Sequence, residues 1–214
     1  TTRKKKFEPK PATPHQIAAI VSEMPDKYKA LILIAAYCGL RWGEVSELRR
    51  KDVDLVAMTI RVDRAVVWRK GTPEVGTPKS YAGIRTVALP SNVKAQLELH
   101  LEGFARPGPD GLLFPNATGT GHLHVNTLSK TFWHAREKAG RPDLRIHDLR
   151  HTYGTLTAQA GASLKESMEL MGHSSVQAAL VYQHVAAGRH AEIAKRIAQL
   201  ADSTSSDQLV AAAE

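Results

Sequence analysis

Apolar residues follow two different spacings along this chain, and the spacing predicts which segments are helical. Residues 27–38 (KYKALILIAAYC) are apolar almost all round, which is typical of a helix buried in the middle of a core. A helix is also expected from Pro14 to about Met24. Its start signal is a cap at Thr13, a proline in the first turn and a glutamine, Gln16, that reaches back. Further amphipathic helices are predicted over residues 91–101, 128–139 and 188–200.

Two other segments alternate between apolar and polar residues, as expected of strands that are buried on one face. These are residues 59–68 (TIRVDRAVVW) and residues 84–89 (IRTVAL). The segment between them, GTPEVGTPKSYAG, is rich in glycine and proline, which is consistent with a middle strand and turns. The chain is therefore expected to combine several helices with a few short strands.

The composition indicates one folded domain with a basic surface. The chain has 214 residues, of which 43% are hydrophobic, enough to bury one core. Lys and Arg exceed Asp and Glu by 29 minus 21, or +8, which favours a polyanionic partner. The alternative is a protein that is basic without binding a polyanion. The single cysteine, Cys38, lies in an apolar stretch, so it is expected in the core. Because there is only one cysteine in this sequence, an internal disulfide and a cysteine-rich zinc site are excluded.

The chain shows no recognisable targeting signal. No segment has the continuous apolar length of a membrane span, and residues 1–14 (TTRKKKFEPKPATP) lack the hydrophobic stretch of a signal peptide. We therefore expect a cytoplasmic protein that does not enter a membrane. Because the chain starts without methionine, on a basic and proline-bearing segment, we also expect it to be a fragment of a longer protein.

Residues 146–185 (IHDLRHTYGTLTAQAGASLKESMELMGHSSVQAALVYQHV) carry the densest reactive chemistry. His147 and Arg150 stand three apart in a predicted helix, so both project from one face. An arginine binds phosphate with two parallel hydrogen bonds, and a histidine moves a proton near neutral pH. LMGHSS predicts a helix that ends at Gly172, with His173 in the turn and Ser174 or Ser175 capping the next helix. That next helix carries Tyr182, whose phenol needs neighbouring positive charge to attack a phosphate.

Three blocks of sequence share a resemblance to one known family. The resemblance is to the tyrosine recombinase (phage integrase) family. The three blocks are HDLRHT, LMGHS and YQH within residues 146–185, CGLRWGEVSEL at residues 38–48, and TPKSYAGIRTVALP at residues 77–90. The resemblance covers roughly Pro14 to His190. It implies a mainly α fold with a small three-stranded antiparallel β-sheet, and a catalytic set that comprises Arg41, Lys79, His147, Arg150, His173 and Tyr182.

The resemblance also implies a role for each of these residues. The two arginines and His173 would hold the phosphoryl oxygens, His147 would assist proton transfer from the nucleophile Tyr182, and a lysine would protonate the leaving oxygen. Lys79 is the expected lysine, with Lys70 as the alternative. Glu44 is expected to orient the site from one turn beyond Arg41. His151 is expected to be a supporting histidine that is packed and hydrogen-bonded rather than reactive.

The reaction that the resemblance implies is cleavage and rejoining of DNA strands through a 3′-phosphotyrosyl link. It requires no cofactor, neither a metal nor ATP, because the bond energy stays in the phosphotyrosine. A zinc site built on His122 and His124 together with His147 is not expected, since no carboxylate or cysteine has ligand spacing. The implied partners are double-stranded DNA attachment sites, a tetramer of the same chain on DNA, and accessory DNA-bending or directionality proteins.

The resemblance divides the chain into three parts. Residues 1–12 are expected to be a basic linker from an N-terminal core-binding domain, residues 13–201 a catalytic domain, and residues 202–214 a linker with a short tail helix. Two other functions share these motifs. A type IB topoisomerase uses the same chemistry without exchanging DNA partners, and a relative without catalysis would bind DNA and never link to it. A histidine-based metal hydrolase is a third alternative, which a chelator tests.

Overall fold

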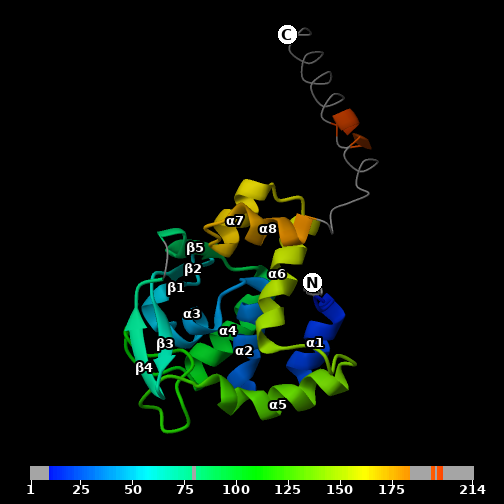
Figure 1. Ribbon diagram of the computed structural model, residues 1–214. Coiled ribbons are helices and arrows are strands. Elements are labelled where there is room, and N and C mark those ends of the chain that lie inside the picture. Colours follow the sequence, from blue (N-terminus) through cyan, green and yellow to red (C-terminus); the bar gives the residue numbers. More distant parts are fainter. Residues whose placement is uncertain (1–9, 79–80, 184–193, 196, 200–214) are drawn as a thin grey trace, which may run out of the picture.

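Helix α2 (Asp26–Tyr37) lies at the centre of the molecule, as its apolar composition predicted (Figure 1). Seven of its side chains are buried on several sides, and it contacts α1, α4 and α6. Because this helix has no polar face, the other helices and the sheet must cover it. Cys38, which follows α2, is fully buried, and burial raises the pKa of its thiol to about 12, in agreement with a core position.

The structure is a computed structural model that describes residues 10–78, 81–183, 194–195 and 197–199. The helices around α2 are α1 (Pro14–Glu23), α3 (Trp42–Glu47), α4 (Ser91–Gly103), α5 (Val125–Lys138), α6 (Ile146–Gln159), α7 (Leu164–Met171) and α8 (Val176–Gln183). The 3₁₀ turn η1 (Arg50–Asp52) connects α3 to the first strand, and the 3₁₀ turn η2 (Tyr81–Gly83) lies between the last two strands. The start signal of α1 is confirmed, since Thr13 and Gln16 cap each other reciprocally.

The strands form two small antiparallel sheets on one side of the helices (Figure 1). The three-stranded sheet has the order β1 (Val53–Asp54), β2 (Thr59–Val62) and β5 (Arg85–Ala88). A separate hairpin pairs β3 (Ala65–Arg69) with β4 (Thr72–Gly76). The predicted fold class, mainly helical with a three-stranded antiparallel sheet, is confirmed.

The strand predicted over residues 59–68 is interrupted, which is a difference from the sequence analysis. Its first half, β2, pairs with β5, whereas its second half, β3, leaves that sheet and pairs with β4. The break falls at Asp63 and Arg64, where the Arg64 side chain turns toward the buried carboxylates of Glu47 and Asp52. The middle strand expected between the two segments exists as β4, but it does not join the three-stranded sheet.

The chain reverses direction sharply between α7 and α8, as the LMGHSS motif predicted. Gly172 ends α7 with a left-handed backbone (φ +61°), a conformation that glycine adopts without steric cost. A Cβ atom at this position would lie 2.9 Å from the carbonyl oxygen of Ala82. The turn therefore requires glycine twice over, and it returns α8 against α6.

Several predicted features fall partly or wholly outside the described residues. Lys79 is one of them, as are residues 1–9, 184–193 and 200–214. Of the helix predicted over residues 188–200, residues 194–195 and 197–199 are described and are helical. Lys10 and Pro11, at the end of the predicted linker, accept hydrogen bonds from Arg141 through their carbonyl oxygens. In the part of the chain that is described, no helix is long and apolar enough to cross a membrane.

Candidate active site

Arg41 immediately precedes α3. Gly39 lies in the short turn that separates α2 from α3. Arg41 Nη1 donates to Glu44 Oε1 at 2.8 Å, and its Nη2 donates to the Gly172 carbonyl oxygen, also at 2.8 Å. The Arg41 side chain keeps 41% of its surface exposed, whereas Glu44 keeps 2%. The expected pairing of Arg41 with Glu44 is confirmed, and it leaves an arginine with an accessible face beside the α7–α8 turn.

Arg150 reaches the same turn from α6. It is 4% exposed, and its two terminal nitrogens donate to the carbonyl oxygens of Gly39 and Met171. Burial and the charge of Arg41 lower the pKa of Arg150 to about 9, so the guanidinium stays charged at neutral pH. Arg150 thus ties the end of α2 to the end of α7 and places a positive charge between them.

Arg85 is a third arginine of this cluster that the sequence analysis did not single out. Its Nη2 donates to Glu44 Oε2 at 3.0 Å, and its Nε donates to the Leu170 carbonyl oxygen at 3.1 Å. Its side chain is only 7% exposed. The available signal was an arginine at the first position of an otherwise apolar, half-buried strand, a place where a long charged side chain needs a partner.

The three arginines outnumber the carboxylate that they share. Burial alone would raise the pKa of the Glu44 carboxyl, but the hydrogen bonds and charge of Arg85 and the backbone N–H of Arg41 lower it, so Glu44 is ionised. One negative charge faces three positive charges on Arg41, Arg85 and Arg150. Among the described residues, the cluster therefore carries an excess of two positive charges in a partly dry region, which favours the binding of an anion.

Tyr182 lies beside this cluster, on α8. The residue is 3% exposed, and its hydroxyl is 2.7 Å from His151 Nδ1. Burial raises the pKa of the Tyr182 phenol, although the charge of Arg150 acts in the opposite direction. Burial, together with the nearby ring of His147, lowers the pKa of His151 to about 4. At neutral pH His151 is therefore neutral, and its Nδ1 is able to accept the proton of the phenol.

Of two further histidines, His173 lies against the phenol ring and His147 lies against His151. The ring of His173 stacks against that of Tyr182, with centroids 6.2 Å apart and an interplanar angle of 12°. Burial and the charges of Arg150 and Arg41 lower the pKa of His173 to about 4. Its Nδ1 is buried without a hydrogen-bond partner among the described residues. The rings of His147 and His151 meet edge-on, with their centroids 5.0 Å apart.

A glycine on α6 makes room for the phenol. A Cβ atom at Gly154 would lie 2.7 Å from Cε1 and Cζ of Tyr182, closer than side-chain atoms approach one another. Gly154 lies one turn from Arg150, so α6 supplies both an arginine of the cluster and the surface on which the Tyr182 ring rests. Sequence patterns do not predict this contact, because it joins residues from different helices.

The structure brings together five of the six residues that were expected to be catalytic: Arg41, His147, Arg150, His173 and Tyr182. The sixth, Lys79, lies outside the described residues. Its alternative, Lys70, occupies the two-residue turn between β3 and β4, with a left-handed backbone (φ 49°). His151 was expected to be a packed, supporting histidine. It is the histidine that contacts the hydroxyl of Tyr182.

The arrangement as a whole places a buried phenol, a neutral histidine and a cluster of arginines side by side. An anion held by the arginine cluster would lie next to a phenol whose proton has an acceptor at hydrogen-bond distance. This site lies on a mainly helical fold with two small antiparallel sheets. Residues 11–189 match the Phage integrase family, and the chain belongs to this family.

Some known proteins are similar to this chain in sequence, and others are similar to it in structure. The prophage phiRv2 integrase of Mycobacterium tuberculosis is 44% identical over 203 residues, which cover 94% of this chain and 54% of the relative. The integrase of Mycobacterium phage D29 is 36% identical over 196 residues, which cover 90% of this chain and 52% of the relative. The chain spans about half the length of these curated relatives.

Two solved structures illustrate the fold. The Tn1549 transposon integrase in complex with circular intermediate DNA superposes with a TM-score of 0.72 at 25% identity, over 92% of this chain and 69% of that one. The catalytic domain of bacteriophage HP1 integrase superposes with a TM-score of 0.57 at 21% identity, over 88% of this chain and 95% of that one. The second likeness, at this low identity, concerns the fold alone.

Proposed function

We propose that this chain cleaves and rejoins DNA strands as the catalytic part of a site-specific recombinase, which integrates or excises a phage or mobile element. The observation that carries the proposal is the position of the Tyr182 hydroxyl. It is hydrogen-bonded to His151 and lies beside an arginine cluster that carries two uncompensated positive charges. The cluster accounts for recognition of a phosphate, and the phenol accounts for a covalent reaction with it.

The first step of the proposed reaction is attack by Tyr182 Oη on the scissile phosphorus. The P–O5′ bond breaks, a 3′-phosphotyrosyl bond forms, and the 5′ oxygen leaves as a hydroxyl. Arg41, Arg150 and His173 hold the non-bridging oxygens, where negative charge develops in the transition state. The proton of the leaving hydroxyl comes from Lys79, by the family resemblance. Attack of a 5′ hydroxyl on the phosphotyrosine reverses these steps and reseals the strand, without metal or ATP.

The proton of the phenol goes to a histidine of α6. His147 is the family's expected participant, but the distance of 2.7 Å favours His151 as the direct acceptor in this chain. A histidine with a pKa of about 4 is a weak base while the site is empty. An anionic phosphate bound between His151 and the arginines would raise that pKa and so make His151 a stronger base. His147, edge-on to His151, would then support the protonated ring.

The proposed partners follow from this function. Double-stranded attachment-site DNA is the substrate, as DNA is present in the complex of the Tn1549 transposon integrase. Exchange of strands between two sites requires two copies of the chain at each site, hence a tetramer on DNA, with accessory DNA-bending or directionality proteins. The reaction would take place on DNA in the bacterial cytoplasm.

The test is covalent capture of DNA. The chain is incubated, in excess chelator, with a library of duplexes whose central segment is randomised. Each duplex carries a nick beside the cleavage position, so that the short strand released by cleavage diffuses away. We expect a protein–DNA adduct on a denaturing gel, with the modified peptide containing Tyr182. Sequencing of the captured DNA then identifies the preferred site, and transfer of the captured strand to a second duplex distinguishes recombination from relaxation of a single duplex.

A matched pair of variants controls for folding. Tyr182→Phe removes the nucleophilic oxygen, so the adduct should disappear while the fold and DNA affinity remain. Tyr153→Phe makes the same change in a second buried tyrosine of the same apolar cluster and should keep the adduct. An adduct that persists in Tyr182→Phe, or one that is lost with chelator in the unmodified chain, would contradict the proposal.

A further inference from the structure

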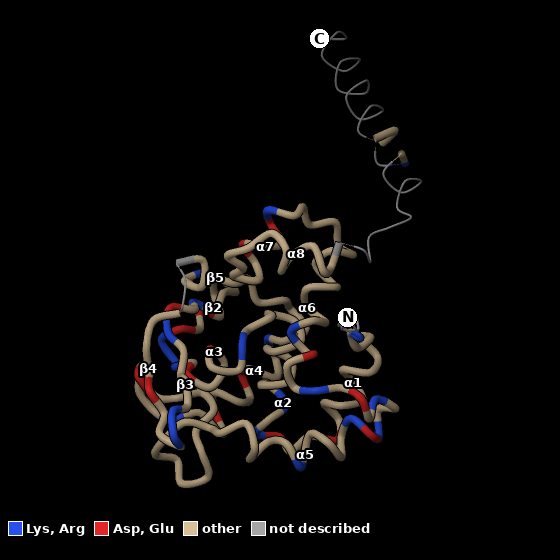
Figure 2. Tube along the Cα trace, in the orientation of Figure 1, with Lys and Arg blue, Asp and Glu red and all other residues tan. Residues whose placement is uncertain are grey.

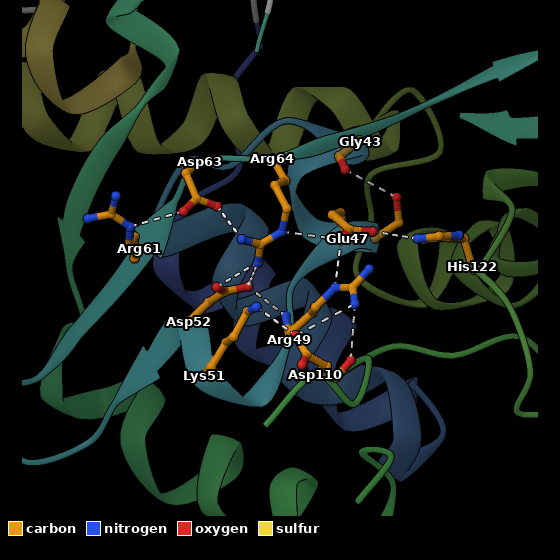
Figure 3. A network of polar contacts seen from close by, with 11 residues as sticks. Gly43, Glu47, Arg49, Lys51, Asp52, Arg61, Asp63, Arg64, Asp110 and His122 are labelled. Atoms are coloured by element: carbon orange, nitrogen blue, oxygen red, sulfur yellow. Dashed lines mark hydrogen bonds and ion pairs between the residues drawn. The ribbon is translucent and has the colours of Figure 1, made fainter. Parts of the chain in front are cut away.

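A second group of charges lies at the end of α3 (Figure 3). Its centre is Glu47, the last residue of α3, which is 1% exposed. Glu47 Oε1 accepts from Arg49 Nε at 2.7 Å and from Arg64 Nε at 3.3 Å, and Glu47 Oε2 is 2.5 Å from His122 Nε2. Because an ionised carboxylate only accepts hydrogen bonds, His122 Nε2 is the donor.

The partners of Glu47 come from three different segments. Arg49 follows α3, Arg64 lies between β2 and β3, and His122 lies in the loop before α5 (Figure 3). Arg64 also binds Asp52 in η1, through two contacts of 2.6 and 2.7 Å. The end of α3 is therefore tied at once to the sheet region, to the 3₁₀ turn and to the loop that leads into α5.

The start of the same helix is tied to the arginine cluster. Helix α3 has six residues, too few to be stable alone, so its orientation depends on what holds its two ends. At its start, Glu44 binds Arg41 and Arg85. At its end, one turn later, Glu47 binds the second group. The two carboxylates are both buried, and together they fix a short helix that Arg41 immediately precedes.

Packing between these ends leaves α3 little freedom. A Cβ atom at Gly43 would lie 2.4 Å from the carbonyl oxygen of Val66, so the helix backbone presses directly on β3. Arg64 lies just before β3, and its hydrogen bond to Glu47 holds the start of that strand close to the end of α3. Loss of the Glu47 carboxylate would leave Arg64 with fewer acceptors and release both the strand and the helix end.

We infer that Glu47, held by His122 and the two arginines, is a positioning residue that aims Arg41 at the scissile phosphate. This inference rests on the proposed function. Glu47 touches no substrate; it acts by fixing α3, and thereby the direction from which the Arg41 guanidinium approaches the phosphate. A displacement of about 1 Å in a group that contacts the transition state is enough to lower a rate by about a hundredfold.

The experiment compares two substrates that differ in charge at one atom. A nicked duplex from the captured site is prepared with a normal phosphate, or with a methylphosphonate in which a methyl group replaces one non-bridging oxygen. The methylphosphonate lacks the negative charge that Arg41 is proposed to hold. A variant that mispositions Arg41 should therefore be slow on phosphate, by about 10- to 100-fold, and close to the unmodified chain on methylphosphonate.

Three variants are measured for covalent capture in a single turnover, for DNA affinity and for thermal unfolding. Glu47→Ala should show the selective loss. Glu47→Gln should lie between Glu47→Ala and the unmodified chain, because its amide oxygen still accepts from the arginines and His122 is able to change tautomer. Glu23→Gln is the control, since Glu23 is the exposed last residue of α1, and it should behave as the unmodified chain. Should Glu47→Ala fail to fold, Glu47→Gln carries the same comparison.

A double-variant cycle tests the route of the effect. If Glu47 acts through Arg41, Glu47→Ala should add little to the loss already caused by Arg41→Ala. Equal losses on both substrates, or full additivity with Arg41→Ala, would overturn the inference and leave the proposed function intact. If the unmodified chain captures neither duplex, the proposed function fails and the inference fails with it.

Discussion

Two groups of buried charges lie on opposite ends of α3, and they differ in their balance. Around Glu47, the carboxylates of Glu47, Asp52, Asp63 and Asp110 face the cations Arg49, Lys51, Arg61 and Arg64 (Figure 3). Positive and negative segments lie together in this part of the molecule (Figure 2). Around Glu44, one carboxylate faces three arginines.

The difference separates a structural role from a binding role. Burying ions is costly, and a balanced network recovers that cost within the protein itself. A network with surplus charge recovers the cost of burying its ions only when it binds an ion of opposite charge. The balanced group is therefore expected to stabilise the fold, whereas the unbalanced group is expected to be stabilised by its ligand. Five predictions test this distinction, beginning with the one that has the largest expected effect.

Removing a member of the balanced group should mainly lower stability. Arg64→Ala would remove one of the two arginines that donate to both buried carboxylates, Glu47 and Asp52, so the free energy of unfolding should fall by about 3–5 kcal/mol. Urea unfolding measures this loss. An unfolding free energy within about 1 kcal/mol of the unmodified chain would show that the balance of this network does not stabilise the fold.

Removing a member of the unbalanced group should mainly lower activity. Arg150→Ala should slow covalent capture by about 10²–10³-fold, or about 2.7–4 kcal/mol, the usual effect of losing one donor to a developing oxyanion. Its unfolding free energy should fall less than that of Arg64→Ala, because the change also relieves repulsion with Arg41 and Arg85. The distinction between the two groups fails if Arg150→Ala captures DNA at the normal rate.

Acid should destabilise the unbalanced group. The folded-state pKa values of His151 and His173 are lowered to about 4 from an ordinary 6.5, so the unfolded chain binds protons more readily than the folded one. Stability is full above pH 6.5 and is lost as the pH falls toward 4. At pH 5 the loss should reach up to about 2 kcal/mol for each histidine, less any screening by solvent. His151→Gln and His173→Gln should each flatten the slope of unfolding free energy against pH.

Sulfate should stabilise the chain through the unbalanced group. At a sulfate concentration about tenfold above its dissociation constant, the gain should be about 1.4 kcal/mol over sodium chloride of the same ionic strength. Thermal unfolding measures the gain, which should be absent in Arg150→Ala and present in Arg64→Ala. An equal gain in both variants would point to a general salt effect.

The smallest effect is expected at the rim of the balanced group. Arg61 pairs with Asp63 at 3.0 Å, but its side chain is 63% exposed. Solvent screens such a pair, so Arg61→Ala should change the unfolding free energy by less than about 1 kcal/mol. This variant is also the control for Arg64→Ala, since both remove an arginine that binds Asp63. A loss as large as that of Arg64→Ala would show that exposure does not decide the value of these pairs.

The sequence by itself determined the local elements and the inventory of chemistry. The capping residues Thr13 and Gln16, the apolar α2 and the glycine end of α7 each depend on neighbours within a few positions along the chain, so their patterns predicted them. The motif residues Arg41, His147, Arg150, His173 and Tyr182 were likewise recognisable, because their order and spacing resemble those of a family. The domain boundaries at residues 12 and 201 remain predictions.

Only the tertiary structure decided which of these residues meet. His151, rather than His147, contacts the Tyr182 hydroxyl, because the path of α8 over Gly154 sets where the phenol lies. Arg85 and Glu44 lie 41 positions apart along the chain, and only the fold brings them within hydrogen-bond distance. The strand expected over residues 59–68 is broken because Arg64 satisfies carboxylates that lie elsewhere in the chain. Periodicity reports the face on which a residue lies, and contacts between distant segments depend on the packing that brings those faces together.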